Sequence, residues 1–176
     1  MNRLPERTAP RAGPAADFLG RPPDQLGFVT TDLAATVAAL TQAWGCGPWD
    51  VHEYTSDTLR HRSYRGRPGT FESRNAVASG GRFGVVQPVT GPSVHADALD
   101  RRGAGLAYVT WFVTDLTAVA EHMERAGIAE AMRGGGHGLD GDGEFAYFDT
   151  VGPLGVYSQY AVAPARRREP VGRLPG

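Results

Sequence analysis

Apolar and polar residues follow one pattern that occurs twice along the chain. Leu26 to Leu33 (LGFVTTDL) and Tyr108 to Leu116 (YVTWFVTDL) each contain a short apolar run that ends in an aspartate. Apolar residues then recur at helical spacing after each run. They are Leu33, Val37, Leu40 and Trp44 in the first copy, and Leu116, Val119, Ala120 and Met123 in the second. Thr31 or Asp32, and Thr114 or Asp115, stand where a helix N-cap is expected. Each copy therefore predicts a strand, a cap and an amphipathic helix.

Glycines end both predicted helices, and strand patterns follow each helix. Gly45 closes the first helix and Gly127 the second. The strands expected after the first helix are 49–54, 70–78 and 82–89, and Ser79-Gly80-Gly81 between the last two indicates a tight hairpin. After the second helix we expect a short strand near Ala131, a glycine-rich loop over 134–143, and strands at 145–149 and 154–162. Both copies thus predict a β-α-β-β-β module.

This pattern divides the chain into five segments, and the predicted class is α+β with two tandem βαβββ modules. The modules are expected at 23–92 and 105–163, joined by a linker, 93–104, with a short helix around 95–101. Residues 1–22 lack periodicity and predict a disordered tail, and residues 164–176 predict a basic tail.

Composition narrows the choice of partners and chemistry. The net charge of -1 gives no reason to expect nucleic acid as a partner, since such binding depends on clustered cations. All 18 basic residues are arginine, so no lysine can form a Schiff base. The single cysteine, Cys46, excludes an intramolecular disulfide and a cysteine-rich zinc site. No apolar run is long enough to span a bilayer, so we expect no membrane partner and a cytoplasmic location.

The duplicated modules and several short motifs resemble the vicinal-oxygen-chelate superfamily, which includes glyoxalases, bleomycin-resistance proteins and extradiol dioxygenases. The motifs are Gly45-Cys-Gly-Pro-Trp49, Tyr64-Arg-Gly66 with Pro68, Gln87-Pro88 with Gly91-Pro-Ser93, Gly103-Ala-Gly105-Leu106, and Phe145-Ala-Tyr-Phe-Asp-Thr150 with Leu154-Gly155. Their order is similar to the glyoxalase-like branch near methylmalonyl-CoA epimerase. The resemblance implies a curved, cup-like mixed sheet with the helices outside and a ligand inside the cup.

In that branch four side chains hold a divalent metal, and the resemblance assigns each position to a residue of this sequence. The two histidine positions fall on Gln25 and Tyr108, and the two acidic positions on Gly84 and Gln159. This set supplies no anionic donor unless the tyrosine ionises, so we expect no metal and no other cofactor. The five histidines do not fall at ligand positions and are expected to be solvated or hydrogen-bonded: His52, His61, His95, His122 and His137.

Without a metal, the cup would still hold polar groups. Strand alternation adds Gly27, Thr110 and Tyr157 to the inner face beside Gln25, Tyr108 and Gln159. A three-residue hairpin loop would place Arg74 inside, whereas a two-residue loop would place Asn75 and Ser73 there. Trp49 and Tyr147 are candidate aromatic walls, and Glu53 is a candidate proton-transfer carboxylate, although an exposed strand position explains it equally.

These residues support two main hypotheses of function. The first is a metal-independent isomerase, cyclase or lyase acting on a carbonyl-containing small molecule, probably of secondary metabolism, with Tyr108, Gln159 and Glu53 as catalytic groups. Gln25, Trp49, Arg74, Thr110, Tyr147 and Tyr157 would contact the substrate. The second is a protein that binds or sequesters a small molecule such as an antibiotic. A scaffold protein with a filled cup is a third alternative, and the sequence allows a homodimer.

Overall fold

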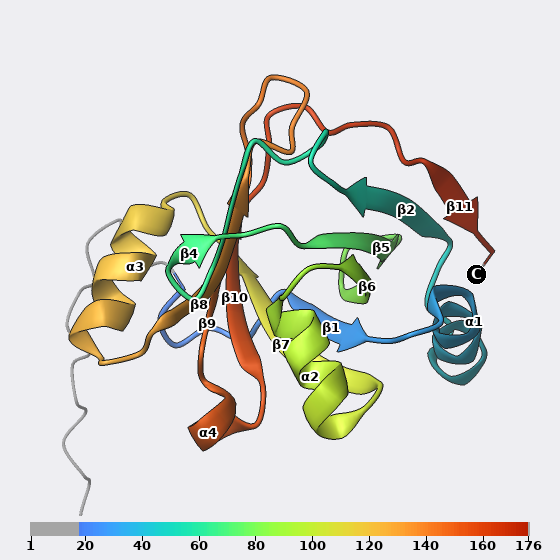
Figure 1. The fold of residues 1–176 in the computed structure, drawn as a ribbon. Coiled ribbons are helices and arrows are strands. Elements are labelled where there is room, and N and C mark those ends of the chain that lie inside the picture. Colours follow the sequence, from blue (N-terminus) through green and yellow to red (C-terminus); the bar gives the residue numbers. More distant parts are fainter. Residues whose placement is uncertain (1–17, 176) are drawn as a thin grey trace, which may run out of the picture.

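The structure is a computed structural model that describes residues 18–175 and has one large mixed sheet (Figure 1). The eleven strands lie in the order β11-β2-β5-β6-β1-β7-β10-β9-β8-β3-β4. The strands are β1 Gln25–Val29, β2 Trp49–Tyr54, β3 His61–Tyr64, β4 Arg67–Pro68, β5 Glu72–Ala78, β6 Phe83–Thr90, β7 Gly105–Phe112, β8 Glu130–Gly135, β9 Glu144–Phe148, β10 Tyr157–Val162 and β11 Gly172–Leu174. The helices are α1 Leu33–Trp44, α2 Val94–Arg102, α3 Leu116–Arg125 and α4 Val151–Leu154.

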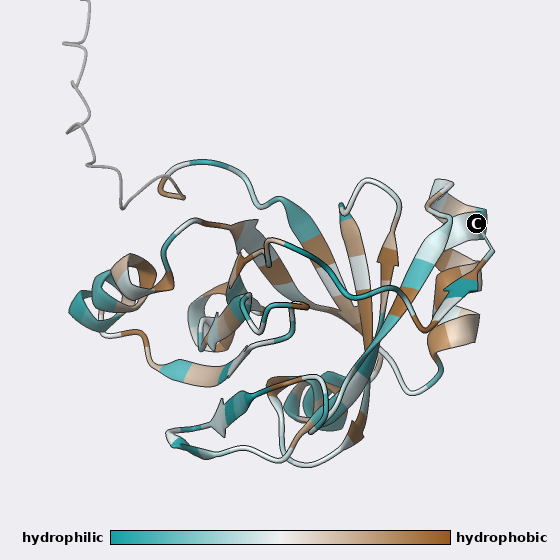
Figure 2. Ribbon diagram, turned by 90° about the horizontal axis from the view of Figure 1, so that it is seen from above, coloured by the Kyte–Doolittle hydropathy of each residue, from teal (hydrophilic) through white to brown (hydrophobic). Residues whose placement is uncertain are grey.

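The two repeated modules form the two halves of this sheet, as the sequence predicts for an α+β chain. In each module the first strand runs parallel to the last, β1 with β6 and β7 with β10. The antiparallel pair β1 and β7 joins the halves at the centre. Helices α1 and α3 lie outside the two halves, and the hydrophilic side of α3 faces away from the sheet (Figures 1 and 2). The predicted curved cup with outer helices is confirmed.

The helix boundaries follow from local chemistry. The Asp32 carboxylate accepts a hydrogen bond from the Ala35 backbone N–H at 3.0 Å, and Asp115 accepts one from Thr117 at 2.8 Å. The predicted N-caps are therefore the aspartates. Gly45 ends α1 with φ 68°, a left-handed conformation that glycine adopts without strain.

Residues 55–71 form an insertion that sequence periodicity did not predict as strands. It leaves the first half after β2 and pairs β3 with β8 of the second half, Ser63 opposite Arg133. Its two apolar residues, Leu59 and Phe71, are buried in the core on the concave face. The insertion therefore connects the two halves across the cup.

The two expected tails differ from their prediction within the described residues. Phe18 is 4% exposed and packs edge-on against Tyr160, so residues 18–22 are not a free tail, whereas 1–17 lie outside the described residues. After β10, residues 163–171 cross from the second half to the first, where β11 pairs with β2 (Figure 1). We call residues 163–171 the strap. Backbone hydrogen bonds supply the order that composition did not reveal, including Leu139 N–H to Arg166 O at 3.0 Å.

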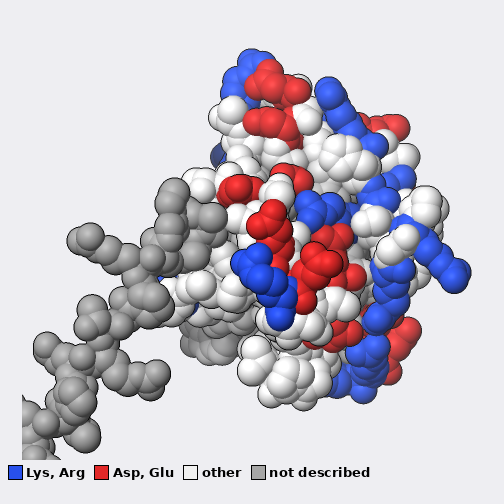
Figure 3. Space-filling view, turned by 90° about the vertical axis from the view of Figure 1, so that its left-hand side faces the viewer, with Lys and Arg blue, Asp and Glu red and all other residues white. Residues whose placement is uncertain are grey.

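Basic and acidic side chains are mixed on the face over α3 and the edge of the second half (Figure 3). No helix among residues 18–175 is long and apolar enough to cross a membrane.

Candidate functional site

Polar side chains from four strands meet on the concave face of the sheet at its centre. Strand pairing places Gln25 opposite Thr110, and Gln159 opposite both Thr110 and Tyr147. Tyr108 lies opposite Tyr157 on the neighbouring strand. The structure thus brings together six residues predicted to share the inner face: Gln25, Tyr108, Thr110, Tyr147, Tyr157 and Gln159. We call this group the central cluster.

Two glycines provide the space that the Tyr108 ring occupies. A Cβ atom on Gly27 would lie 2.1 Å from the Tyr108 ring. A Cβ atom on Gly84 would lie 2.9 Å from Gln25 Oε1 and 3.4 Å from the Tyr108 hydroxyl. Since real Cβ atoms do not approach so closely, the small residues of the first half and the large tyrosine of the second half fit as one packed unit.

The hydrogen bonds of the central cluster connect uncharged groups. The Thr110 hydroxyl donates to Gln159 Oε1 at 2.5 Å, and the Gln25 side-chain amide donates to the Gly81 carbonyl at 2.7 Å. Burial raises the pKa of Tyr147 well above its usual value, and a hydrogen bond with Tyr108 raises it further. Burial likewise raises the pKa of Tyr108, so both phenols keep their protons at neutral pH.

His95 of α2 joins this cluster, and sequence reasoning did not find it. Its Nε2 lies 3.0 Å from the Tyr147 hydroxyl, and its ring packs edge-on against Tyr108 and Tyr147. Burial lowers the pKa of His95 to about 3, so the imidazole is neutral. The prediction that His95 is hydrogen-bonded holds, but its place in the cluster depends on how α2 packs against the sheet. A signal was its position two residues after Ser93, the N-cap of an apolar-faced helix.

The central cluster does not suit the divalent metal that the family resemblance implies. At the four ligand positions stand two neutral amides, one phenol held protonated by burial, and a glycine without a donor. The amide nitrogen of Gln25 and the amide oxygen of Gln159 already have protein partners. Among residues 18–175, no three His, Cys, Asp or Glu side chains are grouped in a way that could hold a metal ion.

Trp49 is not an aromatic wall of the cup. It is fully buried on the convex face, where it packs with Leu33 and Val37 of α1, and its indole N–H donates to the Thr41 hydroxyl at 3.0 Å. A tryptophan that begins a strand beneath an amphipathic helix completes the helix core. This position corrects the prediction.

Glu53 and Arg74 also lie on the convex side, contrary to prediction. They are cross-strand neighbours, and Arg74 Nε lies 3.3 Å from Glu53 Oε1, with both side chains more than two-fifths exposed. The cause is the hairpin register: Val77 pairs with Gly84, which leaves an even-numbered loop over 79–82. The alternative with Asn75 and Ser73 inside is therefore the correct one.

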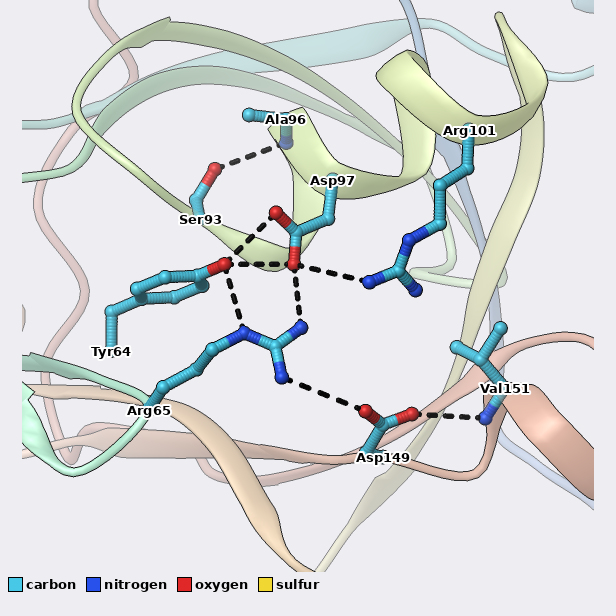
Figure 4. A network of polar contacts seen from close by, with 8 residues as sticks. All are labelled: Tyr64, Arg65, Ser93, Ala96, Asp97, Arg101, Asp149 and Val151. Carbon is cyan, nitrogen blue, oxygen red and sulfur yellow. Dashed lines mark hydrogen bonds and ion pairs between the residues drawn. The ribbon is translucent and has the colours of Figure 1, made fainter.

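A polar network closes the cup at the end where α2 lies (Figure 4). The Asp97 carboxylate of α2 accepts hydrogen bonds from the Tyr64 hydroxyl at 2.8 Å and from the Arg65 guanidinium at 2.8 Å. Arg65 also reaches Asp149 at 3.8 Å, and Arg101 reaches Asp97 at 3.9 Å. These contacts fasten the insertion to α2.

Aromatic rings and apolar side chains fill the space inside the cup. Tyr108, Tyr147 and Tyr157 are each at most 4% exposed. Two hollows on the described surface lie elsewhere, one of about 70 Å³ beside the end of α2 and one of about 370 Å³ beside α3, over Ile128 and Phe148. A ligand that reaches the central cluster must therefore displace or part some of these side chains.

Comparison with solved structures identifies the fold. Methylmalonyl-CoA epimerase from Mycobacterium tuberculosis superposes with a TM-score of 0.52 at 19% identity, over 81% of this chain and 88% of that one. A variant of the Streptomyces coelicolor epimerase in complex with 2-nitronate-propionyl-CoA gives 0.54 at 17% identity, over 81% and 97%. A hypothetical protein from Bacillus halodurans gives 0.55 at 11% identity, over 84% and 98%. At these identities the similarity shows the fold alone.

The sequence comparisons agree with the fold. No curated protein matches the chain. The sequence profile described as Glyoxalase/Bleomycin resistance protein/Dioxygenase superfamily matches residues 24–148, which include all of the first module and most of the second. This chain therefore belongs to the glyoxalase/bleomycin resistance protein/dioxygenase superfamily, the vicinal-oxygen-chelate superfamily.

Proposed function

We propose that this protein is a metal-independent isomerase, cyclase or lyase that acts on a carbonyl-containing small molecule, as part of secondary metabolism. The observation that carries the proposal is the convergence of uncharged hydrogen-bonding side chains at the position where relatives with this fold place a metal. Tyr108, Tyr147 and His95 form its core. The epimerases with this fold support an isomerase-like role, since their reaction class is proton transfer beside a carbonyl.

Tyr108 and Tyr147 supply the main catalytic contribution in this proposal. A phenol that keeps its proton donates a hydrogen bond to a carbonyl oxygen, and this bond strengthens as the oxygen gains charge in an enolate-like transition state. Gln25 and Gln159 hold the substrate in place through their amide groups. These donors stabilise the charge that a Lewis acid would stabilise in a metal-dependent relative.

The proton that leaves the substrate carbon passes to the Tyr147–His95 pair. His95 Nε2 is 3.0 Å from the Tyr147 hydroxyl, within the range for direct proton transfer between them. The low pKa of His95, about 3, makes the imidazole a weak base. We therefore expect substrates with an acidified carbon–hydrogen bond, such as β-diketones, in preference to simple ketones.

Exchange of substrate hydrogen for deuterium tests the proposal directly. The purified protein is incubated in deuterium oxide with a panel of keto acids, β-diketones and acyl thioesters, and proton NMR follows the hydrogens beside the carbonyl. We expect exchange above background for at least one class, and a loss of roughly tenfold or more in the Y147F variant. Y160F is the matched control, because Tyr160 is buried on the convex face. Exchange that is equal in the parent chain, Y147F and Y160F would contradict the proposal.

Non-catalytic binding is the second candidate, and one observation favours it. Glu53, the carboxylate that the sequence offered for proton transfer, lies on the convex side and pairs with Arg74. A cup lined by neutral donors and aromatic rings suits a protein that sequesters a small molecule such as an antibiotic. Saturable ligand binding without deuterium exchange would support this candidate instead.

A further inference from the structure

A second group of polar side chains lies at the end of the cup crossed by the strap. His52 and Tyr54 come from β2, Asn75 from β5 and His137 from the glycine-rich loop. His52 and Asn75 are cross-strand neighbours, and the Tyr54 and His137 rings pack edge-on with centroids 5.6 Å apart. Arg167 of the strap acts electrostatically on His52, Tyr54 and His137. We call these five residues the strap cluster.

The strap cluster contains polar groups without protein partners. Asn75 Oδ1 and His137 Nδ1 are buried and have no hydrogen-bond partner. Buried polar atoms without partners are costly in a folded protein, so each calls for an explanation such as a ligand. Arg167 makes no hydrogen bond or ion pair within residues 18–175, although Arg166 beside it pairs with Asp140. The cluster thus offers an unpaired cation and unpaired polar atoms at one place.

The charge balance of the strap cluster favours a negative ligand. Burial is the main cause that lowers the pKa of His137 to about 4, and the charge of Arg167 lowers it further. The same two causes lower the pKa of His52, while Asp50 acts in the opposite direction. Asp142 opposes the effect at His137, but its Oδ2 already accepts a hydrogen bond from the Ala165 backbone N–H at 2.6 Å. An anion at this place would relieve the excess of positive potential.

The strap cluster is connected to the central cluster through a single aromatic ring. Phe145 packs edge-on against Tyr54 at 6.1 Å and against Tyr147 at 5.9 Å between ring centroids. Tyr54 also acts electrostatically on Tyr108 and Tyr147, which places the two clusters in one electrostatic environment. A small molecule a few bonds long can therefore reach from one cluster to the other.

We propose that the strap cluster binds the anionic group, a carboxylate or a phosphate, of a small molecule whose carbonyl lies among Tyr108, Tyr147 and His95. Arg167 neutralises the charge, and Asn75, His52 and His137 hydrogen-bond the anionic group and its neighbours. The inference rests on the proposed function for the position of the carbonyl. It narrows the substrate class to carbonyl compounds that carry an acidic group.

Binding of levulinate, a keto acid, to the full chain tests this inference. Its methyl ester is the neutral counterpart, and inorganic phosphate distinguishes the second anion. Calorimetry measures affinity at constant ionic strength, and NMR follows the ring protons of His52 and His137. We expect levulinate or phosphate to bind, the ester to bind at least tenfold more weakly, and the pKa of both histidines to rise by roughly one unit on binding. The stronger of the two anions identifies the group.

The R167Q variant and its control locate the binding site. We expect R167Q to weaken anion binding by roughly tenfold or more, because a charge-assisted contact is lost. R125Q, which removes an exposed arginine of α3, should bind like the parent chain. Since Arg167 is an exposed strap residue, its substitution should leave the fold intact, and N75A provides a second variant that should also weaken binding.

Three results would overturn the inference: equal affinity for levulinate and its ester, equal affinity in R167Q and R125Q, or no binding of either anion. A failure of the proposed function gives a different result. If levulinate binds at the strap cluster but no deuterium exchange occurs in any substrate class, the anion site stands and the catalytic proposal fails.

Discussion

The two faces of the sheet bury side chains of different kinds. On the convex face, aliphatic residues of α1 pack on Trp49 and Val51, and the charged residues there, Glu53 and Arg74, pair in solvent. On the concave face, tyrosines and a histidine are buried together with amide and hydroxyl groups. Burial of polar groups opposes folding unless each one is satisfied, so the convex face contributes stability and the concave face carries the polar groups expected of a functional site.

Acidification should distinguish the two faces by the largest effect. Burial lowers the pKa of His95 to about 3 and of His137 to about 4, from 6.5 in the unfolded chain. Between these values only the unfolded chain binds the protons, so stability is full above about pH 6.5 and falls as the pH decreases toward the folded values. We expect a loss on the order of 4 kcal/mol from pH 7 to pH 4. Urea unfolding at a series of pH values measures it.

The H95N/H137N double variant is the control for this pH dependence. Its unfolding free energy should change less with pH over the same range, because the two shifted groups are gone. The same slope in the double variant and the parent chain would show that these histidines are not buried in neutral form.

A methyl group on Gly27 should break the packing of the central cluster. G27A places a Cβ atom at the Tyr108 ring, and we expect a loss of about 2 to 3 kcal/mol in the free energy of unfolding. In a Y108A background the same change should cost less than about 1 kcal/mol, since the ring is absent. A G27A cost that is independent of Tyr108 would refute the packed unit of glycine and tyrosine.

Removal of the Tyr147 hydroxyl should have a smaller effect on stability. Y147F leaves His95 Nε2 without its partner, and we expect a loss of about 1 kcal/mol, measured by urea unfolding at neutral pH. The ring protons of His95 should shift in the NMR spectrum. An unchanged His95 signal would mean that the two side chains are not hydrogen-bonded in solution.

The exposed pair on the convex face should matter least. E53A and R74A should each change the free energy of unfolding by at most about 0.5 kcal/mol, because solvent screens the pair. Neither variant should alter deuterium exchange or anion binding. Loss of activity in E53A with stability unchanged would restore Glu53 as a catalytic candidate.

The sequence predicted the parts of the fold that depend on local periodicity. The repeat fixed both modules, and the caps Asp32 and Asp115 and the stop at Gly45 follow from single residues. Positions along β1, β7 and β10 alternate, so the inner-face residues Gln25, Tyr108 and Gln159 could be assigned in advance.

Features that depend on distant contacts could not be predicted in this way. The side of the sheet on which Arg74 lies depends on one residue of hairpin length. The strap and β11 have the composition of a tail and are ordered by pairing with β2 and the glycine-rich loop. His95 joins the central cluster only because α2 packs across the sheet, which no local pattern specifies.

Metal titration tests the replaced metal site, the central claim, most directly. Zinc, nickel and cobalt are titrated by calorimetry into the protein after treatment with a chelator, and the Q25A, Y108F and Q159A variants are measured in parallel. The donor set of neutral amides and a protonated phenol predicts no stoichiometric binding in the parent chain and no difference among the variants. Stoichiometric binding of one of these metals that is lost in Q25A or Q159A would contradict the account.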